Sequence, residues 1–294
     1  MTTTTAAQPT TRTLDVPGAT LTYDVRPNDG TTEPPLFLIG SPMGAGGFPT
    51  LAAHLAERTI VTYDPRGSER STAHDPAAPI RPEHHAEDLH AIVEAIGGGP
   101  VDVFASSGGA VNALAWIARY PADVRTLVAH EPPLASLLPD REHALAATRA
   151  INATYMDRGW GAGMAHFIQV VSHRGPFTAE TAALPAPDPA LFGMPAADDG
   201  SRNDLMLGHG VLYTTAFEPD LAALAEVPTR IVVGVGAKSD GEMAHRAGEV
   251  VAERLGLQPT IFPGDHGGFL GGEYGQVGEP EAFAAKLREV LAQS

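Results

Sequence analysis

The stretch VDVFASSGGAVNALAWIARY, residues 101–120, joins a β-branched run to an apolar helical run through five small residues. A buried strand that passes directly into a helix is typical of the βαβ units of a parallel sheet. Such sheets bind ligands beyond the carboxyl ends of their strands, and the adjacent Ser106 and Ser107 stand at that point. One of these two serines is therefore a candidate nucleophile.

The small residues around the turn indicate which serine it presents. A sharp strand-to-helix turn strains the residue at its apex, and the residues two before and two after the apex must be small. Around Ser107 these flanks are Ala105 and Gly109, whereas around Ser106 one of them is Phe104, whose ring does not fit. The pattern predicts Ser107 at the apex.

Short apolar runs alternate with amphipathic helical runs on both sides of this turn. This alternation predicts an α/β protein with a mostly parallel sheet, and the apolar–polar alternation around Pro17-Gly18 predicts a β-hairpin at the edge of the sheet. The runs expected to form strands are residues 34–40, 59–64, 101–106, 124–130, 229–236 and 259–264.

The alternation breaks in the later half of the chain, where amphipathic segments surround a stretch rich in Pro, Ala and Asp. We interpret residues 132–227 as a helical cap inserted after the sixth strand. Residues 13–131 and 228–294 then form the α/β core, and the Thr-rich residues 1–12 form a disordered tail.

Composition excludes several classes of protein. Of the 294 residues 43% are hydrophobic and 18% are charged, which suits one large α/β domain with an insertion. The net charge of −16 disfavours nucleic acid and anionic membranes as partners, and no run of eighteen apolar residues predicts a membrane span. The chain lacks cysteine and an apolar secretory segment near its start, so we expect a cytoplasmic protein.

The Ala-Ser-Ser-Gly-Gly turn resembles the nucleophile elbow of the alpha/beta-hydrolase superfamily, with Ala105 where that family usually has Gly. Three further stretches resemble family segments in the family's order: LFLIGSPMGAGG (36–47), TYDPRGSERS (62–71) and FPGDHGGF (262–269). The first of them has Ile39-Gly40 where a His-Gly pair is usual. The resemblance implies an alpha/beta-hydrolase fold, a mostly parallel central sheet with a helical cap.

The resemblance also implies a Ser-His-acid triad, because a serine hydroxyl needs a base. His266, in the Gly-rich loop after the last expected strand, would be that base. The acid has two candidates, Glu131 after the strand that precedes the cap and Asp240 after the strand that follows it. The family's usual spacing from Gly236 would put the acid at Ser239, so Asp240 stands one residue late. Glu131 is preferred, since the two prolines after it would fix its backbone and some haloalkane dehalogenases have their acid there.

The oxyanion hole implied by the resemblance consists of the backbone amides of Gly108 and Ser41, with Met43 as the alternative to Ser41. The predicted function is hydrolysis of a small, largely apolar ester or lactone through an acyl-enzyme, with an acyl small molecule as partner and neither metal nor organic cofactor. C–C bond hydrolysis, peptide cleavage and perhydrolysis use the same triad and stay open. A ligand-binding module or a catalyst of cyclisation or elimination on the same fold is the alternative from another class.

The remaining histidines carry weaker expectations. Those of the core helices are interpreted as structural or solvated, and EHHAED (83–88) as an exposed helix start rather than a metal site. Those of the cap are candidates for substrate contact. The core histidines in question are His54, His84, His85, His90 and His245, and the cap histidines are His143, His166, His173 and His209.

Overall fold

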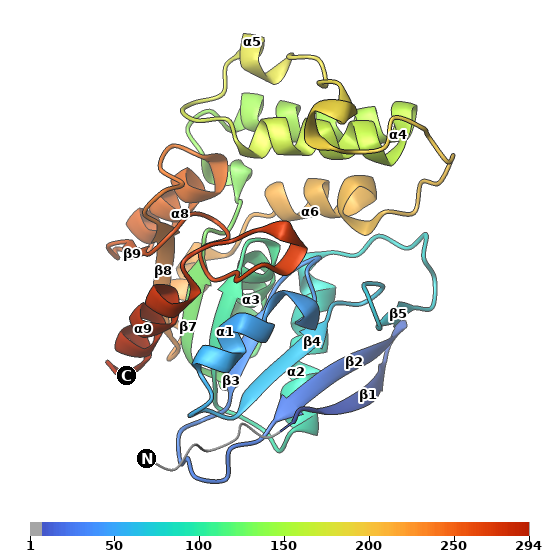
Figure 1. Cartoon of the computed structure of the whole chain (residues 1–294). Helices are drawn as coiled ribbons and strands as arrows, with labels where there is room; N and C mark the ends of the chain where they lie inside the picture. The colour runs from blue at the N-terminus through green and yellow to red at the C-terminus, as the bar shows by residue number, and fades with distance from the viewer. Residues whose placement is uncertain (1–7, 294) are drawn as a thin grey trace.

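A computed structural model describes residues 8–293, and its strands form one nine-stranded sheet (Figure 1). β-branched and apolar residues dominate the central strands, which are buried on both faces. The strands are β1 (Thr10–Val16), β2 (Ala19–Arg26), β3 (Leu36–Ile39), β4 (Ile60–Asp64), β5 (Thr72–Ala73), β6 (Val101–Ser106), β7 (Val124–His130), β8 (Arg230–Gly236) and β9 (Thr260–Phe262).

Helices connect most of the strands. Pro stands in the first turn of three of the α-helices, where its missing N–H costs no hydrogen bond. The α-helices are α1 (Pro49–His54), α2 (Pro82–Ala95), α3 (Gly108–Arg119), α4 (Arg141–Val171), α5 (Ala179–Ala182), α6 (Val211–Thr215), α7 (Leu221–Glu226), α8 (Met243–Arg254) and α9 (Pro280–Leu291). The shorter helical turns are η1 (Ala45–Gly47), η2 (Ala135–Leu137), η3 (Pro189–Phe192), η4 (Met206–Gly210) and η5 (Glu273–Gly275).

The sheet is parallel except at one edge. Its order is β1-β2-β4-β3-β6-β7-β8-β9, with β5 beside β2. All pairs from β4 to β9 along this order are parallel, whereas every pair that involves β2 is antiparallel. The predicted mostly parallel sheet and its edge hairpin are confirmed, and Gly18 at the hairpin turn has the positive φ of 80° that glycine adopts without strain.

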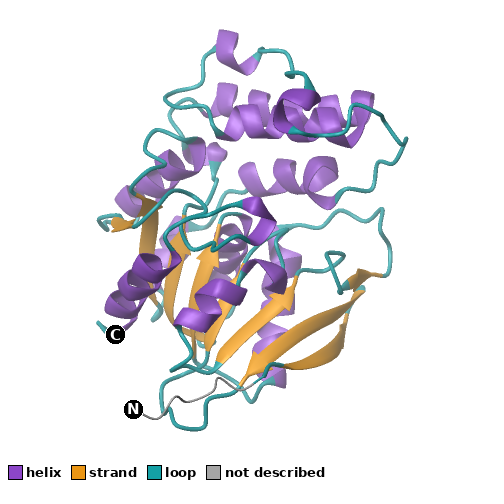
Figure 2. Ribbon diagram, in the orientation of Figure 1, coloured by secondary structure: helices purple, strands orange, loops and turns teal. Residues whose placement is uncertain are grey.

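Helices cover both faces of the sheet (Figure 2). Because successive side chains of a strand point to opposite faces, β3 contributes to two separate apolar clusters. Leu36 and Leu38 pack with residues of α1 and α9, while Phe37 and Ile39 pack with residues of α2, α3 and α8. The α/β fold class is therefore confirmed, and its core has two layers of helix around one sheet.

The regular elements between β7 and β8 are helical, from η2 to α7, and Figure 1 shows α4, α5 and α6 stacked beyond one end of the sheet. The long α4 changes direction at Gly159, whose φ of 82° lies outside the helical region. We call residues 132–227 the inserted helices. Among the described residues, no helix combines the length and the apolar character that crossing a membrane requires.

Two sequence predictions need correction. Strand β1 begins at Thr10 and pairs with β2 from Thr10 opposite Val25, so the predicted tail of residues 1–12 is three residues too long, and residues 1–7 lie outside the described part. The two-residue β5 was not expected, since a strand this short has no sequence pattern of its own. In the described part of the chain it pairs with Thr20 and Ala19 of β2. It makes the strand before the inserted helices the seventh rather than the sixth.

Candidate active site

Ser107 lies at the turn between β6 and α3 and has φ 57° and ψ −128°. A positive φ is rare for a residue with a side chain, and it is held here by a hydrogen bond from Ser107 N–H to the His130 carbonyl at 3.0 Å. The strain predicted for the apex is present at Ser107. The turn thus presents Ser107, and Ser106 is buried as the last residue of β6.

The small residues after Ser107 are required by the end of β3. A Cβ added to Gly109 would lie 2.6 Å from the Ile39 carbonyl oxygen, and one added to Gly108 would lie 2.6 Å from the Ser41 carbonyl oxygen. Both contacts are with backbone, which cannot rotate away. The prediction that Gly109 must be small therefore holds. The reason is the close approach of the Ile39 backbone from another strand, which the sequence around Ser107 does not show.

Glu131 is the first residue after β7 and is fully buried, with φ 48°. Its Oε2 accepts a hydrogen bond from His266 Nδ1 at 2.6 Å. Its Oε1 accepts from Gly236 N at 2.8 Å and from the Ser239 hydroxyl. Burial alone would raise the pKa of Glu131, but the hydrogen bonds from His245 and His266 outweigh it and hold the pKa far below its usual range. Glu131 is therefore a permanent anion at neutral pH.

The structure brings Glu131, and not Asp240, to His266. The Asp240 side chain is 87% exposed, and its Oδ1 lies 3.9 Å from Nε2 of another histidine, His245. Ser239, where the family spacing would put the acid, donates to Glu131 instead. The loop after β8 thus supports the carboxylate that follows β7.

His266 follows β9, and its side chain is 39% exposed. Its loop is fastened to the loop after β8 by a hydrogen bond from Lys238 N to the Gly264 carbonyl at 2.8 Å. Desolvation would lower the pKa of His266, but the hydrogen bond and the charge of Glu131 prevail and raise it. Because the carboxylate accepts at Nδ1, Nε2 is the nitrogen left to accept a proton.

Ser107, Gly108, Ser41 and His266 all line one cavity of about 700 Å³. Gly108 is the first residue of α3, where the N–H groups of a helix lack partners within the helix and attract negative charge. The Ser41 loop lies directly against it. Met43 instead folds back on its own loop, where its side chain occupies the space that a Cβ on Gly47 would need.

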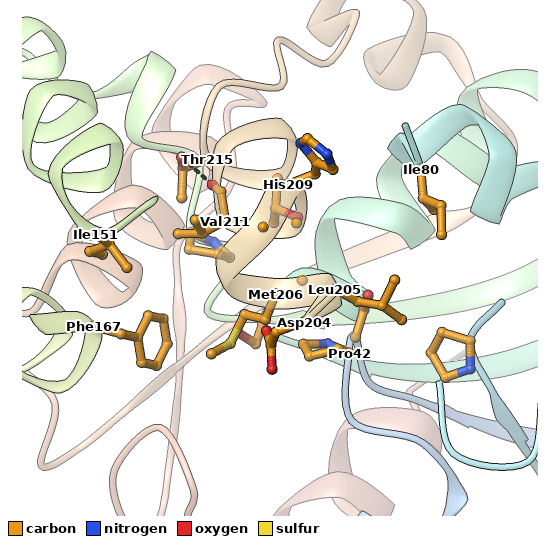
Figure 3. Close-up of a pocket in the computed structure, with 18 of the residues that line it drawn as sticks. Pro42, Ile80, Ile151, Phe167, Asp204, Leu205, Met206, His209, Val211 and Thr215 are labelled. Atoms are coloured by element: carbon orange, nitrogen blue, oxygen red, sulfur yellow. Dashed lines mark hydrogen bonds between the residues drawn. The ribbon is translucent and has the colours of Figure 1, made fainter. Parts of the chain in front are cut away.

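The inserted helices form much of the cavity wall, and Figure 3 shows Phe167 and Met206 among its side chains. The wall is mainly apolar. Its apolar residues include Pro42, Pro65, Ile80, Pro133, Ile151, Phe167, Ile168, Val171, Leu205, Met206, Val211 and Met243. A cavity of this size with an apolar wall is suited to a small organic molecule.

Four polar residues near the site were missed or undervalued at the sequence level. His245, interpreted as structural, is 6% exposed, and its Nδ1 lies 3.5 Å from Glu131 Oε1. That contact with Glu131 raises the pKa of His245. Ser239 was noted only for its spacing, while His85 and Asn112 line the cavity. A lone polar residue in a helical pattern carries no signal of what packs against it, so the sequence could not have found these contacts.

Of the four cap histidines named as candidates for substrate contact, His209 lines the cavity, whereas His143, His166 and His173 do not. The EHHAED segment lies in the first turns of α2, but it is not the exposed helix start that was expected, because His85 and Asp88 are buried. Across residues 8–293, no group of three or more His, Cys, Asp or Glu side chains is arranged to hold a metal ion.

Known proteins resemble this chain over nearly all of its length. The uncharacterized hydrolase YraK of Bacillus subtilis (strain 168) is 30% identical over 258 residues, which cover 87% of this chain and 89% of YraK. The alpha/beta hydrolase MGS-M2, from a Medee basin deep-sea metagenome library, has a TM-score of 0.69 at 15% identity, with 96% of this chain and 98% of MGS-M2 covered. The esterase EaEST of Exiguobacterium antarcticum has a TM-score of 0.65 at 19% identity, with 94% and 97% covered.

A family model described as alpha/beta hydrolase fold matches residues 35–180, which run from β3 through the Ser107 turn and Glu131 into the inserted helices. The match agrees with the parallel sheet, with the strained serine turn and with the similarity to YraK. The chain therefore belongs to the alpha/beta-hydrolase superfamily.

Proposed function

We propose that this hydrolase cleaves a small ester or lactone through an acyl-enzyme formed on Ser107. The observation that carries the proposal is the hydrogen bond between buried Glu131 and His266, because His266 shares its cavity with the strained Ser107. This is the chain order serine, acid, histidine of a triad in which the acid orients the base.

In this proposal His266 Nε2 takes the proton of the Ser107 hydroxyl while its oxygen attacks the acyl carbon. The oxyanion that forms accepts hydrogen bonds from the N–H groups of Gly108 and Ser41. His266 then gives its proton to the leaving alcohol as the bond between the acyl carbon and the alcohol oxygen breaks. In the second half of the reaction His266 takes a proton from water while the water oxygen attacks the acyl carbon. His266 returns that proton to the Ser107 oxygen as the Ser107–acyl bond breaks, and the acyl group leaves as a carboxylic acid. Glu131 keeps the imidazole in the tautomer with the proton on Nδ1 and stabilises its cation. The mainly apolar cavity wall favours an acyl or alcohol part of modest size.

Covalent labelling tests the proposal most directly. We expect a fluorophosphonate to add once to the folded protein, as read by intact mass, and peptide mapping to assign the adduct to Ser107 rather than to the neighbouring Ser106. Heat-denatured protein is the control and should not react, because a serine hydroxyl without its base is a poor nucleophile. A folded protein that stays unlabelled would contradict the acyl-enzyme and favour a ligand-binding or non-hydrolytic member of the fold.

The pH profile gives a second prediction. We expect kcat/KM for p-nitrophenyl butanoate to fall as the pH drops through the pKa of His266, since the protonated ring cannot accept the Ser107 proton. Because Glu131 raises that pKa, the acid limb should lie above the pKa of about 6.5 of a free histidine. Circular dichroism over the same pH range separates titration from unfolding. A limb centred below 6.5 in folded protein would disprove the raised pKa.

A further inference from the structure

The charged side chains that line the cavity share one property, which is that each is engaged by a neighbouring residue. A side chain that already has a partner gains little from an opposite charge on the substrate. A charged substrate would therefore lose its hydration in this cavity without gaining an ion pair. Four of these engaged pairs are ion pairs, and two are contacts with a neutral aromatic group. The ion pairs are Arg66 with Asp88, Arg202 with Asp198, Glu242 with Arg174 and His266 with Glu131, and the other contacts are Asp204 with the Trp160 indole and Arg81 above the Tyr213 ring. The cavity therefore favours an uncharged ligand.

Two other polar residues of the cavity wall have unpaired atoms. Asn112 is 1% exposed and His85 is 8% exposed, yet Asn112 Nδ2 and His85 Nδ1 find no hydrogen-bond partner among the described residues. A buried polar atom left unpaired costs about 1–3 kcal/mol, so such atoms are rare and need an explanation. Desolvation, followed by the nearby charge of Arg66, lowers the pKa of His85 to about 3, and its ring is neutral at neutral pH.

The two residues lie on neighbouring helices close to the proposed nucleophile. Asn112 is on α3, five residues after Ser107, which corresponds to about 7 Å along a helix at about 1.5 Å per residue. It also follows Gly108 by four residues, which places both on the same face of α3, toward the cavity they line. His85 is on α2, which packs against α3.

We propose that Asn112 and His85 form a subsite for an uncharged hydrogen-bonding group of the substrate, a secondary amide, about 7 Å from Ser107. The proposal rests on the ester or lactone hydrolysis proposed above. A carboxamide and a neutral imidazole each offer a donor and an acceptor, and a secondary amide offers the matching pair. The amide thus replaces its hydration with two hydrogen bonds in a cavity whose wall is mainly apolar.

Matched substrates test the subsite. p-Nitrophenyl N-acetyl-β-alaninate and p-nitrophenyl hexanoate have acyl chains of equal length, and only the first contains an amide. 2-Acetamidoethyl butanoate and pentyl butanoate place the same difference in the alcohol. We expect kcat/KM to favour the amide in one of the two pairs by about thirtyfold after correction for non-enzymatic reactivity, since two hydrogen bonds of about 1 kcal/mol each are at stake.

Variants assign that preference to the subsite. Asn112→Leu and, separately, His85→Phe should reduce the ratio of kcat/KM for the amide ester to that for its amide-free partner to within about twofold. Thr214→Val, which removes another polar group of the wall, is the matched control and should keep the preference. A purely structural role in joining α2 to α3 would instead lower the melting temperature and slow both esters of a pair equally.

The outcomes separate the subsite from the catalytic proposal. Fluorophosphonate labelling of Ser107 without an amide preference in either pair would overturn the subsite and leave the hydrolase standing. An amide preference that survives both Asn112→Leu and His85→Phe would also overturn it. Absence of labelling would mean that the proposed function itself had failed. If Asn112→Leu does not fold, as judged by circular dichroism, His85→Phe on the other helix gives the same test.

Discussion

Replacing Ser107 by alanine is expected to lower kcat/KM for p-nitrophenyl butanoate by about 10⁴-fold or more, because the oxygen that forms the acyl-enzyme is lost. A residual rate from the oxyanion-binding amides and from substrate binding should remain above that in water. KM is expected to change little, since the apolar wall that surrounds the substrate is untouched. Steady-state kinetics with a burst-phase measurement provide the test, and the burst that the proposed acyl-enzyme predicts for the wild type should be absent from the variant.

Ser106→Ala is the matched control for this loss. Ser106 is the neighbouring hydroxyl, but it is buried as the last residue of β6 and does not line the cavity wall. Its removal should leave kcat/KM within about tenfold, the scale of one ordinary buried hydrogen bond. Equal losses in the two variants would indicate a damaged turn, and a Ser107→Ala enzyme with full activity would exclude the acyl-enzyme.

Replacing Glu131 by glutamine is expected to lower kcat by about 10⁴-fold, although the side chain keeps its shape. A carboxamide has one oxygen, so glutamine cannot accept from both His266 Nδ1 and Gly236 N as the two carboxylate oxygens do. It also supplies no charge to stabilise the imidazolium. The folded protein should also be less stable, since Gly236 N, Ser239 and His245 all lie against the same buried carboxylate. Kinetics and thermal unfolding measured side by side separate the two effects.

Asp240→Asn tests the other acid at the same time. Its side chain is exposed, and among residues 8–293 its one ion-pair contact is with His245, at 3.9 Å, so kcat should stay within about twofold and the melting temperature should not move. A large loss in Asp240→Asn together with a mild one in Glu131→Gln would reverse the roles assigned here. Because both variants replace a carboxylate by a carboxamide, they differ only in position.

Much of the fold follows from local patterns in the chain. Strands β3, β6 and β7 are short apolar runs bounded by turn residues. Their residues are apolar because the strands of a parallel sheet are buried on both faces. Ser107 could be chosen over Ser106 because an apex at Ser106 would put Phe104, which is too large, two residues before it. The edges were less predictable. Thr10 to Arg12 joined a strand, and β5 formed from two residues, because pairing with β2 outweighs weak local preference.

The contacts around the acid required the tertiary structure. β7 and β8 are parallel neighbours, with His130 opposite Gly234, so the acids that follow them reach the same edge of the sheet. The sequence places both Glu131 and Asp240 at that edge and gives only a preference for Glu131. A left-handed backbone at Glu131 and complete burial turn one carboxylate to His266, while Asp240 remains in solvent. Neither property is visible in residues 124–131 alone.

By itself, the sequence determined the α/β class and the strained serine turn, because each depends on residues close together in the chain. The proposed order of serine, acid and histidine came from the family resemblance, since Ser107, Glu131 and His266 are far apart in the chain. The tertiary structure alone decided that Glu131 contacts His266, that Ser239 and His245 support Glu131, and that Asn112 and His85 face one cavity. Those contacts join residues from different strands and helices. Their distances are set by how the helices pack on the sheet, and a local sequence pattern carries no record of that packing.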